Sequence, residues 1–74
     1  MKNNDRYSTQ EPIDISMETQ RSYVYPNGEK YTIKFPKELF IRNTGGHRVV
    51  DGTTAHIIRS GWIAITIPKE CLVF

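Results

Sequence analysis

The sequence predicts a small all-β domain, and three features of its 74 residues support this fold class. Short runs of alternating apolar and polar residues recur from Tyr23 onward, with the period of a strand that buries one face. Asn-Gly and Asp-Gly pairs separate these runs, and both dipeptides favour the tight turns of β-hairpins. Apolar residues do not recur at helical spacing. We therefore expect an antiparallel sheet of about five strands.

Residues 1–21 are predicted to form a flexible polar tail, and residues 22–74 the folded domain. The tail is rich in Asn, Asp, Gln, Ser, Thr and Glu, and it lacks the apolar side chains that would offset the entropy of ordering it. Apolar and polar residues alternate only over 13–17, which predicts an edge strand there as the alternative to a mobile chain.

The first hairpin is predicted around Asn27-Gly28, placed in a type I′ turn. This register sets Tyr23 opposite Thr32 and Val24 opposite Tyr31. A one-residue slip would bury the lysines, so the alternation fixes which face is the core. The expected core face carries Val24, Tyr31, Ile33 and Phe35. The expected outer face carries Tyr23, Tyr25, Lys30, Thr32 and Lys34.

The middle of the chain is predicted to make a connection and then a second hairpin. Pro36 ends the preceding strand, and residues 36–40 are expected to form a helical or 3₁₀ turn, with a strand over 39–42 as the alternative. Asp51-Gly52 is predicted to be the second hairpin turn, which sets His47 opposite His56.

The last strand is predicted over 62–67, with its isoleucines facing the core. Trp62 then points outward, and an exposed tryptophan on a small domain marks a contact surface. The alternative is that the tail, or Leu72 and Phe74, bury Trp62. The expected architecture is a small antiparallel SH3-like barrel or a curled sheet.

Charge and cysteine content limit the partners and the compartment. The formal charge is +2, divided into −1 over residues 1–21 and +3 over residues 22–74, which is small for a nucleic-acid-binding domain and favours a mildly anionic partner. A single cysteine, the absence of a signal segment, and the absence of an apolar run near the ~18 residues of a membrane span predict a cytoplasmic protein without membrane contact.

The residues with chemical potential do not assemble into a predicted active site. Facing imidazoles at His47 and His56 are weak candidates for a metal site because a third ligand is lacking; the alternatives are a stacked or hydrogen-bonded pair and a pH sensor. Cys71 lies in an apolar run, where cysteine is usually inert. Gly45-Gly46 lacks the further residues of a phosphate-binding loop. We expect no enzymatic activity and no cofactor.

A binding surface is the leading functional prediction. Aromatic and basic side chains are the usual anchors of protein interfaces, and together they also suit nucleic acid, which is the second choice. Open sheet edges and the apolar C-terminal residues predict a homodimer as well. The predicted partner-binding residues are Tyr23, Tyr25, Lys30, Lys34, Arg48, Arg59 and Trp62.

The block over residues 45–52, followed by His56 and Gly61-Trp62, resembles small uncharacterised accessory proteins of tailed phages and prophages. The resemblance covers about residues 45–67. It implies a non-enzymatic protein that binds and blocks or adapts a host protein in the host cytoplasm, or takes a minor place in the virion. It transfers no functional residue to this chain.

Overall fold

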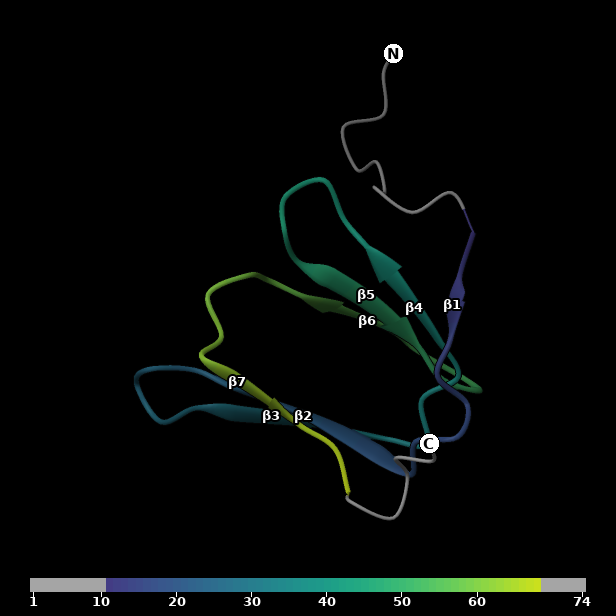
Figure 1. The fold of residues 1–74 in the computed structure, drawn as a ribbon, viewed down its shortest axis with the longest axis horizontal. Helices are drawn as coiled ribbons and strands as arrows, with labels where there is room; N and C mark the ends of the chain where they lie inside the picture. The colour runs from purple at the N-terminus through teal and green to yellow at the C-terminus, as the bar shows by residue number, and fades with distance from the viewer. Residues whose placement is uncertain (1–10, 69–74) are drawn as a thin grey trace.

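The computed structural model describes residues 11–68, which form seven short strands in two antiparallel sheets (Figure 1). The all-β fold class is therefore confirmed. Within these residues there is no helix long and apolar enough to cross a membrane. The C-terminal residues 69–74, with Cys71, Leu72 and Phe74, lie outside the described range.

The strands are arranged in two layers, which Figure 1 shows one above the other. The four-stranded sheet has the order β1-β4-β5-β6, with β1 at Ile13–Asp14, β4 at Glu38–Ile41, β5 at His47–Val50 and β6 at Ala55–Ile58. The three-stranded sheet has the order β3-β2-β7, with β2 at Gln20–Val24, β3 at Lys30–Lys34 and β7 at Ala64–Thr66. Among residues 11–68, β3 and β6 each have one paired side only, so the predicted barrel is not closed and the curled-sheet alternative holds.

The hydrophobic core lies between the two layers, as expected for a two-layer domain. Both sheets and the chain before β2 contribute to it. Its buried members are Ile15, Tyr23, Ile33, Leu39, Val49 and Ile58. Partly buried Tyr25, Trp62 and Ile65 pack against them.

The register predicted for the first hairpin was wrong by one residue. Tyr23 pairs with Tyr31, not with Thr32. The turn has three residues, because Gly28 N–H donates to the Tyr25 carbonyl (2.9 Å) and Tyr25 N–H donates to the Glu29 carbonyl (2.9 Å). Pro26 supplies the fixed φ of the second turn position, and Gly28 takes φ +92° in the left-handed position that follows.

This slip moved Tyr23 from the predicted outer face to the core, where it is 0% exposed. Its predicted role in partner binding is corrected accordingly, because a fully buried side chain cannot touch a partner. Val24 moved from the predicted core to the opposite face. Ile33 is buried as predicted, and Lys30 and Lys34 are exposed as predicted.

The register predicted for the second hairpin was wrong by two residues, but the predicted assignment of its residues to the two faces was right. His47 pairs with Ile58 and Val49 pairs with His56, so the two histidines are not directly opposed. A four-residue loop over 51–54 replaces the two-residue turn, since Asp51 N–H donates to the Thr54 carbonyl (2.9 Å). A shift of two residues preserves the alternation of faces, which keeps both imidazoles on the core side.

The connection after β3 differs from the expected helical turn, because β4 is a strand. Phe35 was predicted to be in the core but is 66% exposed, with φ +50°. That backbone conformation ends β3 and directs Pro36, which is fully buried, into the interior instead. The strand alternative for this segment is confirmed.

The chain before β2 is part of the folded unit from β1 onward. The tail was expected to extend to residue 21, with an edge strand over 13–17 as the alternative. In the structure Ile13–Asp14 pairs with β4 at the edge of its sheet, and Ile15 is buried. Residues 1–10 lie outside the described range.

Candidate functional site

A groove lies between β3 and β6, and residues of both strands line it. Its volume is about 480 Å³. Two of its apolar walls are accessible to solvent, since Tyr31 is 45% and Ile57 is 53% exposed. Large accessible apolar side chains with a few charged neighbours are typical of binding sites. The lining residues are Tyr25, Glu29, Lys30, Tyr31, Ile57, Ile58 and Arg59.

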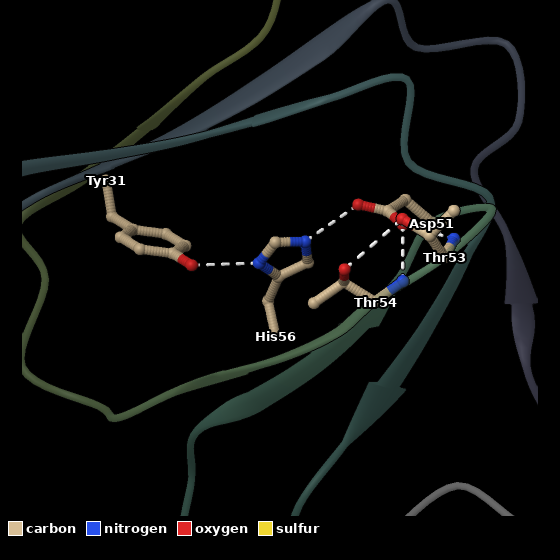
Figure 2. A network of polar contacts seen from close by, with 5 residues as sticks. All are labelled: Tyr31, Asp51, Thr53, Thr54 and His56. Carbon is tan, nitrogen blue, oxygen red and sulfur yellow. Dashed lines mark hydrogen bonds and ion pairs between the residues drawn. The ribbon is translucent and has the colours of Figure 1, made fainter.

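A row of three polar side chains bridges the two sheets beside this groove, as Figure 2 shows. The Tyr31 hydroxyl lies 2.8 Å from Nδ1 of His56, and Nε2 of His56 lies 2.8 Å from Oδ2 of Asp51. Tyr31 comes from β3, His56 from β6 and Asp51 from the loop that precedes β6. The row therefore fixes the position of the Tyr31 ring at the groove.

The carboxylate of Asp51 determines which His56 nitrogen carries the proton. Its pKa lies well below the usual range because it accepts hydrogen bonds from His56 and from the backbone N–H groups of Thr53 and Thr54. An ionised Asp51 accepts the Nε2–H proton of His56, which leaves Nδ1 to accept the Tyr31 O–H. The Tyr31 oxygen then keeps a lone pair with which it can accept a hydrogen bond.

The opposite end of the groove is held by Tyr25 and Arg59. The Tyr25 hydroxyl donates to the Arg59 carbonyl (2.7 Å), and the Arg59 guanidinium lies over the Tyr25 ring at 5.5 Å. The same guanidinium lies 3.8 Å from Glu29. Both of these charged side chains are well exposed, so their ion pair contributes little to stability and is available for exchange with a ligand.

A second polar row lies inside the core and is structural. The Tyr23 hydroxyl lies within hydrogen-bond distance of Nδ1 of His47 (2.6 Å), and the Tyr23 oxygen accepts from Arg21 (3.2 Å). Trp62 covers this row, with its ring 5.0 Å from Tyr23 and 4.7 Å from His47. Burial lowers the pKa of His47, and the charge of Arg21 lowers it further.

We expect the fold to lose stability on acidification because of His47. Its folded-state pKa is below the ordinary value of 6.5, so the unfolded chain takes up the proton first as the pH falls. The contribution is complete above pH 6.5 and is lost as the pH falls toward the folded-state pKa. The urea midpoint should therefore be lower at about pH 5.5 than at about pH 7.5. A His47→Gln variant should show a smaller change, and an equal change would contradict this origin.

The predicted contact residues do not form one surface. Tyr25, Lys30 and Arg59 line the groove, and Lys34 lies further along β3 on its exposed face. Trp62 is half-buried against Tyr23 and His47 and does not point fully outward; Leu72 and Phe74, its predicted alternative covers, lie outside the described residues. Arg48 lies on the other sheet, stacked over Phe40 at 5.4 Å.

The prediction that His47 and His56 face each other was wrong. Each imidazole Nδ1 contacts a tyrosine hydroxyl from the other sheet rather than the other histidine. Within residues 11–68 no group of three or more His, Cys, Asp or Glu side chains is placed to hold a metal ion.

Two groove residues, Tyr31 and Ile57, were not predicted, and neither was the contact between Asp51 and His56 beside the groove. Tyr31 was assigned to the core, and Ile57 was not distinguished from its neighbours. One signal for Asp51 was present in the sequence: an aspartate two residues before Thr53-Thr54 is typical of a side chain that caps its own turn.

No known protein family, curated protein or solved structure matches the chain.

Proposed function

We propose that this protein is a non-enzymatic interaction module that binds a segment of another protein in the groove between β3 and β6. The observation that carries the proposal is the pairing of accessible apolar walls with a tyrosine held rigid by the His56–Asp51 row. Rigid aromatic side chains make contacts at low entropic cost, which is why they dominate protein-binding sites. The phage-type role and the cytoplasmic or virion location stay predictions that the identity of the partner will decide.

The alternative, nucleic-acid binding, has less support from the arrangement of side chains. It depended on tyrosines and lysines sharing one face of the first hairpin. In the structure Tyr23 and Tyr25 lie on the core side of the sheet, whereas Lys30 and Lys34 lie on the other. Of the four residues on which this alternative depended, only Tyr25 and Lys30 meet, at the groove; Tyr23 is buried and Lys34 lies outside the groove lining.

The proposal is tested by panning the full chain against a random peptide display library. We expect enriched peptides whose affinity falls about tenfold with Ile57→Ala, since a central apolar contact is worth about 1–2 kcal/mol. The matched control is Ile63→Ala, another exposed isoleucine that does not line the groove.

Equal effects of the two isoleucine variants, or a library without binders, would overturn the proposal. A single-stranded oligonucleotide that binds at low salt and is unaffected by Ile57→Ala would favour the nucleic-acid alternative instead.

A further inference from the structure

The free edge of β3 exposes main-chain groups at defined positions. Phe35 N–H donates to the Thr19 carbonyl (2.8 Å), and Tyr25 N–H donates to the Glu29 carbonyl (2.9 Å), which fixes the odd-numbered residues of β3 as the ones bonded to β2. The N–H and C=O groups of Lys30, Thr32 and Lys34 therefore point away from β2. Among residues 11–68 no strand pairs with this edge. Such an edge is a ready template for an added strand.

The side chains along this edge differ between its two faces. Lys30, Thr32 and Lys34 are exposed on the outer face. Tyr31 and Ile33 lie on the inner face, and Tyr31 lines the groove together with Ile57. A strand added to β3 would therefore place alternate side chains beside two lysines and the intervening ones beside the apolar wall.

A second copy of this chain is a poor occupant of the edge because of charge. Antiparallel pairing of two β3 strands centred on Thr32 sets Lys30 opposite Lys34, and parallel pairing in register sets each lysine beside itself. Like charges directly opposite each other are destabilising, and edge lysines are a common protection against self-association. The same lysines attract acidic side chains, whereas the charges of Arg59 and Glu29 at the groove offset each other.

We infer that the groove takes an extended peptide as a fourth strand beside β3, with acidic residues at alternate positions and apolar residues between them. Its main chain bonds to Lys30, Thr32 and Lys34, its acidic side chains lie next to the two lysines, and its apolar side chains pack on Tyr31 and Ile57. This inference rests on the proposed function and adds the binding mode and the chemistry of the partner.

The test uses a capped seven-residue peptide in which Glu alternates with Val, and a matched peptide in which Lys replaces Glu. We expect the acidic peptide to bind the full chain at least about tenfold more tightly than the basic one, with weaker binding at higher salt. The double variant Lys30→Glu with Lys34→Glu should reverse this preference. Lys37→Glu, an exposed lysine outside the strand, should not.

Strand addition is separated from simple charge attraction by N-methylation of the peptide. Two versions of the acidic peptide are made. One carries methyl groups on the backbone amides of its odd-numbered residues, and the other carries them on the amides of its even-numbered residues. Only the amides that face β3 bond to it, so one version should lose at least about tenfold in affinity and the other should not. Equal losses, or equal binding of acidic and basic peptides, would overturn the inference. If either result is found but Ile57→Ala still weakens the binding of library peptides, the proposed function stands and only the proposed binding mode is wrong.

Discussion

A Gly46→Ala variant is expected to be largely unfolded at room temperature. Gly46 is buried where the chain enters β5, and a methyl group there would collide with the carbonyl oxygen of Ile58 and lie 3.4 Å from the Arg59 Cα. Both obstacles are backbone atoms of the neighbouring strand, so neither can swing aside. Steric overlap of this kind costs about 3 kcal/mol or more, which is comparable with the total stability of a domain of this size.

The matched control for this prediction is Gly52→Ala. A methyl group at Gly52 would meet only the end of the Lys37 side chain, at 3.7 Å, in an exposed loop. Its effect on the free energy of unfolding should stay within about 0.5 kcal/mol. Urea denaturation followed by circular dichroism measures both variants. A folded Gly46→Ala protein with a midpoint close to that of Gly52→Ala would show that β5 and β6 do not approach as closely as described.

Breaking the buried ion pair between Glu18 and Arg21 is the second change with a large expected effect. Arg21 donates to both carboxylate oxygens of Glu18 (2.9 and 3.1 Å), and each side chain is only 9% exposed. Burial acts to lower the pKa of Arg21, but its bonds with Glu18 and Tyr23 raise it overall, so the guanidinium stays charged. Glu18→Ala would leave that charge buried, with the Tyr23 hydroxyl as its remaining side-chain partner among residues 11–68, at a cost of about 3–5 kcal/mol.

Two further variants separate the lost partner from a general loss of packing. Glu38→Ala removes an exposed carboxylate and should change the free energy of unfolding by less than about 0.5 kcal/mol. The double variant Glu18→Ala with Arg21→Met removes both charges and should recover much of the loss in chemical denaturation. A double variant less stable than Glu18→Ala alone would contradict the assignment of the cost to an unpaired charge.

The sequence was sufficient to predict both hairpins and the last strand, but it offered β1 and β4 only as alternatives and did not show how the strands pair. Asn27-Gly28 and Asp51-Gly52 lie in turns as predicted, since both dipeptides favour the required backbone angles. Pro26 lengthened the first turn by one residue, which exchanged the faces of Tyr23 and Val24. Asp51 lengthened the second turn by two residues through its own hydrogen bonds, which left the faces unchanged. An error of one residue in loop length therefore changed which side chains face the core, whereas an error of two residues did not.

The candidate site was predicted only in part for the same reason. Tyr25, Lys30 and Arg59 were selected by residue type, and all three line the groove. The bridge from Tyr31 to His56 joins edge strands of different sheets, and local patterns carry no information about such a contact. The lysines on β3 were assigned to one exposed face of the sheet, but their pattern did not show that β3 is an edge strand.

The most direct test of the binding groove is an NMR titration of isotope-labelled protein with a peptide enriched from the display library. We predict that the largest shift changes fall on Tyr31, Ile57 and Arg59, which line the groove between β3 and β6. Changes centred instead on Asp14, Lys37 and Val50, which line a separate hollow, would contradict this account of where the protein binds its partner.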